Sequence, residues 1–137
     1  VDDQSVIQKI ANAASQQFIT KAKYVVVACS NPSLTINSYD ERGKRYCRQQ
    51  AGAALQNFLL KIKETGLATC WVGAFSDRLV REALKIPGKI NVEAIFPIGY
   101  EIGKTILKRK IDMDRILYFN KYKNKKMRPP KVAKEFV

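Results

Sequence analysis

The chain has 137 residues, of which 46% are hydrophobic and 27% charged, and it carries a net charge of +13; this is one globular domain by length and composition. No apolar run approaches the roughly 20 residues of a membrane-spanning helix, so we expect no membrane partner. Histidine is absent, which excludes Ser-His-Asp and Cys-His catalysis and histidine-based zinc motifs, so an enzyme of this composition would depend on a cofactor.

The pattern of apolar and polar residues in the N-terminal part of the chain predicts a helix, a strand and a loop. Apolar residues at three-and-four spacing predict an amphipathic helix over residues 3–17. Residues 24–29 are continuously apolar and rich in valine, which predicts a buried strand. Residues 31–39 are typical of a loop because of their Pro, Asn and Ser content. The apolar positions of the helix are Val6, Ile7, Ile10, Ala11, Ala14 and Phe18.

The middle of the chain has a helical pattern over residues 44–65 with an unusual density of small residues on one face. Gly66 is placed to end this helix in a left-handed conformation, and a strand is expected over 67–72. The small residues are Ala51, Gly52, Ala53 and Ala54, and we expect this face to be buried.

A short helix and a final strand are expected next. Ser76 is a suitable N-cap for a helix over 77–85, and residues 92–99 read as a strand in which Pro97 predicts a bulge or an end. The order helix, strand, helix, strand, helix, strand predicts an α/β (α+β) fold, a three-layer sandwich with a central sheet flanked by helices.

The C-terminal quarter is strongly basic, since residues 104–137 hold 12 Lys and Arg against three Asp and Glu. Residues 111–119 suggest a short helix or strand, and residues 121–134 read as an extended arm. We therefore expect a domain over 1–120 and a basic arm over 121–137. Such an arm is either simply solvated or contacts phosphate, nucleic acid or an acidic surface.

Three cysteines, Cys29, Cys47 and Cys70, form no C-x-x-C pair. Their odd number and scattered positions suit a reducing cytoplasm, and we expect them to be small buried hydrophobic residues.

Four segments in order resemble the nitroreductase family of FMN-dependent NAD(P)H oxidoreductases, and the resemblance extends from about residue 1 to 118. They are the helix at 49–60, Gly66-x-x-Thr-Cys-Trp-Val-Gly-Ala-Phe75, the helix at 77–85 with Ile86-Pro87, and Pro97-Ile-Gly-Tyr100. Each motif alone is weak, whereas the ordered set is specific.

The resemblance implies a cofactor site. It places the flavin ring against the strand-end turn of Trp71, Val72, Gly73 and Ala74, where a glycine lets the main chain approach a flat ring and fixed N–H groups tune its charge. It also implies that Lys108, Arg109 and Lys110 contact the FMN phosphate, through a bidentate guanidinium and point charges. In a lysine-rich segment, the same triplet also reads as solvated surface.

The chain departs from the family pattern in two places. The Arg-Arg-Ser-x-Arg segment and the Ser/Pro/Asn stretch that open family members are missing, so Val1 corresponds to a point roughly a third of the way along such a protein. Gln49-Gln50 stands where many relatives have Gln-Asp. We therefore expect a fragment of a longer protein that holds FMN weakly or not at all.

The implied function is transfer of hydride from NAD(P)H to flavin and of electrons to a small-molecule acceptor such as a nitroaromatic or quinone, by a homodimer with flavin between subunits. Two alternatives stay open. One is a basic nucleic-acid-binding module in which Tyr118, Phe119 and Tyr122 stack on bases, although nucleic acid is the less favoured partner. The other is a remnant of the fold that no longer binds flavin.

Overall fold

A computed structural model describes residues 1–103 and 109–126. The chain divides into two compact units, Val1–Gly103 and Lys104–Val137, which are described separately below. The expected boundary at residue 120 stays a prediction. Within the described ranges, no helix is both long and apolar enough to cross a bilayer.

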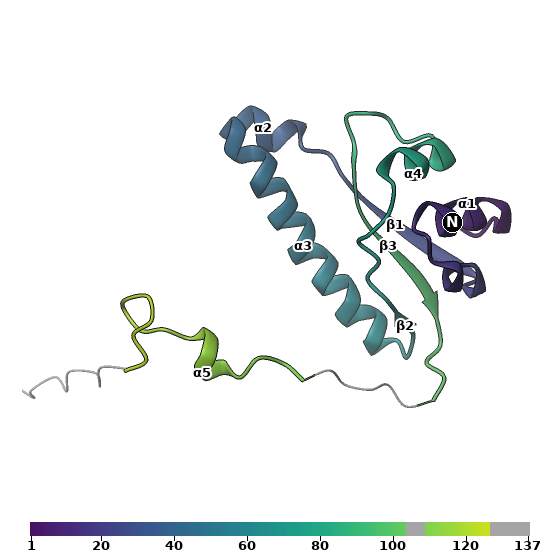
Figure 1. Ribbon diagram of the computed structural model, residues 1–137. Helices are drawn as coiled ribbons and strands as arrows, with labels where there is room; N and C mark the ends of the chain where they lie inside the picture. Colours follow the sequence, from purple (N-terminus) through teal and green to yellow (C-terminus); the bar gives the residue numbers. More distant parts are fainter. Residues whose placement is uncertain (104–108, 127–137) are drawn as a thin grey trace, which may run out of the picture. The chain divides into compact units, whose positions relative to one another are not determined.

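The centre of the first unit is a three-stranded antiparallel sheet in the order β1-β3-β2 (Figure 1). The strands are β1 (Tyr24–Ser30), β3 (Asn91–Gly99) and β2 (Ala68–Thr69). The expected strand at 67–72 is thus mostly irregular, and its far end is held only by an isolated bridge between Val72 and Ile95. At the outer edge of β1, Val1 and Val25 exchange two backbone hydrogen bonds of 2.9 Å.

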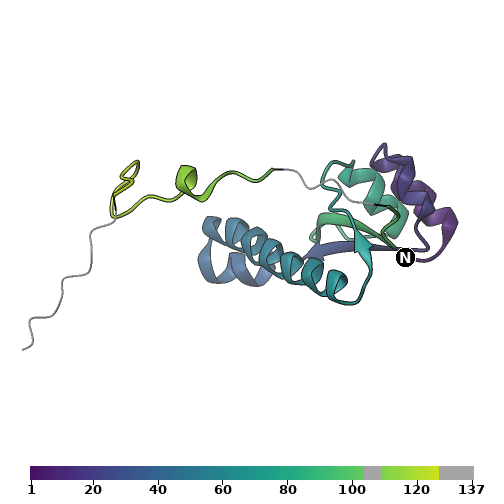
Figure 2. The same cartoon turned by 90° about the horizontal axis from the view of Figure 1, so that it is seen from below.

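Helices cover both faces of this sheet, which confirms the predicted three-layer α+β architecture (Figure 2). On one face lie α1 (Gln4–Ala13) and α4 (Asp77–Leu84), and on the other lies α3 (Glu41–Glu64). Ile7, Val25 and Val80 pack together in the core between the sheet and the helices α1 and α4. Phe96 is fully buried and contacts Phe58 of α3 edge to face at 5.4 Å.

The first helix is shorter than predicted. It ends at Ala13, Ser15 has a positive φ of 52°, and a 3-10 helix, η1 (Gln17–Lys21), follows. The turn redirects the chain, so Phe18 does not continue the apolar face of the helix and is 45% exposed.

The expected loop over 31–39 is wrong for most of its length, because α2 (Ser33–Tyr39) is helical. Pro32 stands immediately before this helix, where a missing N–H costs nothing, and Asn31 accepts a hydrogen bond from the Ser33 N–H at 3.2 Å. No residue of α2 is buried. It packs against the start of α3, where Tyr39 meets Tyr46 edge to face at 5.2 Å.

Helix α3 runs close to its predicted range, but its expected burial is only partly correct. Gly43 and Cys47 are its buried residues, whereas Ala53 and Ala54 are exposed. The helix therefore contacts the sheet with a narrower stripe than the sequence suggests. Gly66 has the predicted positive φ, 76°, directly after the helix.

Pro97 lies inside β3, opposite Val25, so the strand neither ends nor bulges there. The register shifts instead between Ala28 and Cys29 of β1, where Glu93 of β3 has no partner residue. Val25 directs both backbone groups outward to Val1, so its pair with Pro97 needs no hydrogen bond from proline. The Thr69 hydroxyl donates to the Pro97 carbonyl at 2.8 Å.

In the second unit, α5 (Met113–Ile116) decides between the helix and the strand expected over 111–119 in favour of a helix. Residues 121–126 turn back instead of extending, because Phe119 and Asn124 hold a closed loop: the Phe119 N–H donates to the Asn124 carbonyl at 2.8 Å. The Asn124 side chain returns a bond to the Phe119 carbonyl at 2.7 Å. The rest of the predicted arm lies outside the described residues.

Candidate functional site

The turn that follows β2 is anchored at its centre by Val72. This residue is 2% exposed, and its N–H and carbonyl exchange 3.0 Å hydrogen bonds with Ile95 of the central strand. Trp71 is 42% exposed, and its ring lies edge to face on the buried Phe96 ring at 5.3 Å. The turn thus rests on the sheet while one large ring faces outward.

The two residues after the anchor present open backbone. Gly73 and Ala74 are exposed, and within the described part of the chain neither N–H has a hydrogen-bond acceptor. A Cβ added at Gly73 would meet only the Trp71 ring, at 3.6 Å, which is an ordinary contact. Two consecutive free donors beside an exposed aromatic ring can bind a planar group that carries acceptor atoms.

The expected phosphate ligands lie in the second unit. Lys108 falls outside the described residues. Arg109 is exposed, and its Nη2 lies 3.3 Å from Oδ2 of Asp112, while Lys110 is also exposed. Because the two units are described separately, the assignment of these residues to a flavin phosphate stays a prediction.

The aromatic residues proposed for base stacking form a contact of their own. Tyr118 and Tyr122 meet edge to face at 5.0 Å, and the ammonium of Lys125 lies 4.0 Å from the Tyr118 ring centroid. One face of Tyr118 is therefore already occupied. The structure gives the nucleic-acid alternative no specific support.

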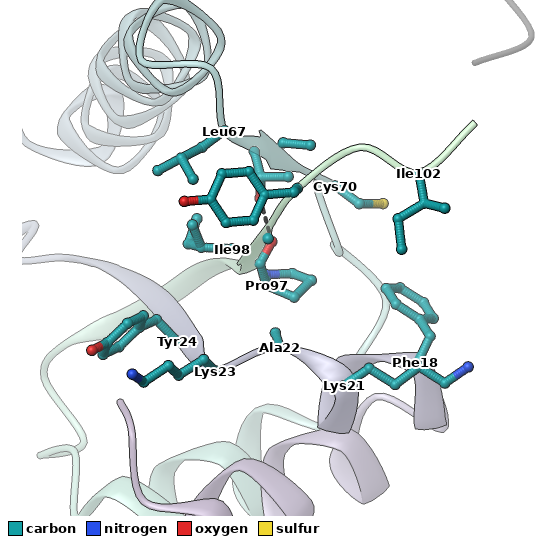
Figure 3. A pocket seen from close by; sticks show the side chains of 14 residues that line it. Phe18, Lys21, Ala22, Lys23, Tyr24, Leu67, Cys70, Pro97, Ile98 and Ile102 are labelled. Carbon is teal, nitrogen blue, oxygen red and sulfur yellow. Dashed lines mark hydrogen bonds between the residues drawn. The ribbon is translucent and has the colours of Figure 1, made fainter. Parts of the chain in front are cut away.

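Sequence reasoning missed a cavity of about 890 Å³ in the first unit, which lies where β1 begins and β3 ends (Figure 3). Its walls come from η1, from the segment around β2 and from the residues after β3. It includes Cys70 but none of residues 71–74. No single stretch of sequence signals it, because its lining comes from separate segments.

The cysteines are only partly as expected. All three are free; Cys47 is buried, whereas Cys29 and Cys70 are exposed. Partial burial raises the pKa of the Cys29 thiol above its ordinary value, and the nearby Arg81 opposes that change. No group of three or more metal-ligating side chains occurs in the described residues.

A family model for the nitroreductase family matches residues 2–100, which is most of the chain. The chain belongs to the nitroreductase family. A nitroreductase-like protein of Methanocaldococcus jannaschii is 38% identical over 101 residues, covering 73% of this chain and 50% of the relative. The chain therefore spans about half the length of that curated relative.

Solved structures of this family share the fold. A nitroreductase family protein from Clostridium novyi is 30% identical with a TM-score of 0.63, over 90% of this chain and 68% of that protein. The NADPH:FMN oxidoreductase of Vibrio harveyi, solved with NAD⁺, has a TM-score of 0.78 at 20% identity, over 90% of this chain and 58% of that one. At that lower identity the similarity concerns the fold alone.

Proposed function

We propose that this chain is the flavin-binding part of an FMN-dependent oxidoreductase that uses NAD(P)H. The observation that carries the proposal is the turn at 71–74 in a member of the nitroreductase family, with two free N–H donors and an open approach at Gly73. FMN, when bound, accepts hydride from NAD(P)H and passes electrons to a small-molecule acceptor such as a nitroaromatic or quinone.

The residues of the turn fit such a group. The Gly73 and Ala74 N–H groups would donate to acceptor atoms at the edge of the ring, and the absence of a side chain at Gly73 lets the ring come close. Val72 fixes the position of these donors relative to the sheet through its two backbone hydrogen bonds to Ile95. Arg109 and Lys110, both exposed, are proposed to contact the phosphate.

Trp71 provides the test, since it is the single tryptophan of the chain and belongs to the turn. FMN should quench Trp71 emission saturably.

The decisive comparison is Gly73→Val against Gly88→Val. A Cβ at Gly73 meets only the Trp71 ring and one at Gly88 meets nothing within 4 Å, and neither glycine has a positive φ, so both variants should fold. Only Gly73→Val places a side chain where the ring would lie, and we expect it to weaken FMN binding at least about tenfold. Equal affinities would refute the assignment of this turn to flavin.

We also propose that the protein acts as a homodimer through α3. This helix has 24 residues, yet Gly43 and Cys47 are its buried ones, and Leu60 is 61% exposed. Ala53 and Ala54 add small exposed residues on which a second helix can pack closely.

Ala54→Lys tests the dimer. Because Ala54 is exposed within the subunit, the variant monomer should melt at nearly the same temperature as the parent monomer. In the dimer the added ammonium would be buried without a partner, which would disfavour association. Sedimentation velocity should show dimers for the parent and monomers for the variant. Gln8→Lys, at an exposed position of α1 and therefore outside the proposed interface, is the control for added charge. A dimer that tolerates Ala54→Lys would contradict this interface.

A reducing location, the cytoplasm, is proposed on the strength of the two exposed free thiols, Cys29 and Cys70.

A further inference from the structure

The cavity of about 890 Å³ is built from three separate segments of the first unit. Phe18 and Lys21 reach it from η1, Leu67 and Cys70 border it beside β2, and Ile102 follows β3 on the far side (Figure 3). Its volume is within the range of small-molecule sites, which is roughly 300–1,000 Å³.

Apolar side chains that face solvent gather around this cavity. Tyr24 is 49% exposed, Tyr100 79% and Ile102 98%, and all three border it. Pro97 and Ile98 of β3 also contribute to its lining. Aromatic and aliphatic groups that converge on one hollow, instead of being scattered singly, indicate a surface that is covered by a ligand.

The two lysines at this cavity extend to opposite sides of it (Figure 3). Lys21 and Lys23 both border it, and no Asp or Glu of the described residues lies within 4.0 Å of either ammonium. Lys23 lies over the Tyr24 ring, with its Nζ 5.5 Å from the ring centroid. The cavity therefore offers an apolar lining together with unneutralised positive charge.

We propose that this cavity binds an apolar organic anion, a ring system or acyl chain that carries one carboxylate, sulfonate or similar group. The apolar body would lie against Phe18, Pro97 and Ile102, and the anionic group would face Lys21, which lies on the same side of the cavity as Phe18 (Figure 3). Because residues 71–74 are not part of the lining, the site is distinct from the turn proposed for flavin and goes beyond the proposed function.

Two thiols of the full 137-residue chain make the site measurable. Cys70 borders the cavity, and Cys29 is exposed outside it. Iodoacetamide labelling followed by mass spectrometry gives the rate at each thiol with and without 8-anilinonaphthalene-1-sulfonate as the probe. Each rate is compared with its own value without probe, because the raised pKa of Cys29 lowers its thiolate fraction. We expect the probe to slow labelling of Cys70 at least fivefold and to leave Cys29 unchanged.

A matched pair of probes isolates the charge. N-phenyl-1-naphthylamine is the same molecule without the sulfonate, and fluorescence gives the affinity of both. The double variant Lys21→Gln/Lys23→Gln should weaken sulfonate binding about 2- to 5-fold, the range of one exposed ion pair, and leave the affinity for the neutral probe unchanged. The control, Lys9→Gln/Lys89→Gln, removes equal charge from exposed positions outside the lining and should change neither affinity.

Several results would overturn the proposal. Equal protection of Cys29 and Cys70 would show unspecific adsorption. An equal loss in both double variants would show attraction to net charge alone. Displacement of the probe by excess FMN would make the cavity part of the flavin site, and loss of probe binding on concentration-dependent dimerisation would show that a second copy of the chain covers it.

Discussion

Replacing Gly43 by alanine tests how α2 is attached to α3. A Cβ at this position would lie 2.2 Å from the Thr35 carbonyl oxygen and 2.5 Å from the Ile36 Cα, both backbone atoms of α2. Ordinary contacts begin near 3.4 Å, so α2 must move by about an ångström or leave its place. Overpacking of this kind costs about 1–3 kcal/mol.

Gly52→Ala is the matched control, because Gly52 also lies in α3 and a Cβ there meets nothing within 4 Å. Both substitutions gain helix propensity, about 1 kcal/mol in a helix interior. That gain largely cancels in the comparison, so the difference in unfolding free energy between the variants should approach the overpacking cost of 1–3 kcal/mol.

The assay is urea unfolding followed by circular dichroism, with hydrogen exchange to locate the change. No residue of α2 is buried, so the helix can detach without unfolding the sheet. We therefore expect Gly43→Ala to raise amide exchange over 33–39 while the strands stay protected. Two variants of equal stability, with α2 equally protected, would refute the close contact at Gly43.

Two further predictions concern charged groups. Asp3 caps α1 by accepting from the Ser5 N–H at 2.8 Å, and its hydrogen bonds to Ser5 lower the pKa of its carboxyl below the ordinary value. Since the pKa is lower in the folded state, the stabilisation is fully present above the unfolded-state pKa and is lost as pH falls through the folded-state pKa. Asp3→Ala should therefore lower the melting temperature at pH 7 and have little effect in strong acid. Arg109→Ala should reduce FMN affinity by about 1.5–3 kcal/mol and riboflavin affinity hardly at all, because only FMN has a phosphate; Lys121→Ala is the control, and equal losses for both flavins would indicate a folding defect.

Local signals in the sequence predicted the elements that local physics determines. Gly66 ends α3 with a positive φ because only a residue without Cβ adopts it freely, and Ser76 caps α4 by accepting from the Leu79 N–H at 3.5 Å. The family motifs pointed to the turn at 71–74, and the contact of that turn with flavin stays a prediction.

The misses have tertiary causes. Helix α2 has no apolar periodicity and depends on close approach at Gly43, which cannot be read from 31–39 alone. Ser15 adopts a left-handed conformation without being glycine, so the change of direction that removes Phe18 from the helix has no sequence signal. The expected burial of Ala54 treated a small-residue face as a core face, whereas within one subunit it stays exposed.

One chain of aromatic contacts joins the helix layer to the candidate site. Phe96 is fully buried in the central strand and meets Phe58 of α3 at 5.4 Å and Trp71 of the turn at 5.3 Å, both edge to face. Phe96 therefore packs between Phe58 of α3 and the Trp71 ring, which lies beside the free N–H groups of the turn. If the proposed dimer forms through α3, a shift of this helix would reach the turn through these two aromatic contacts.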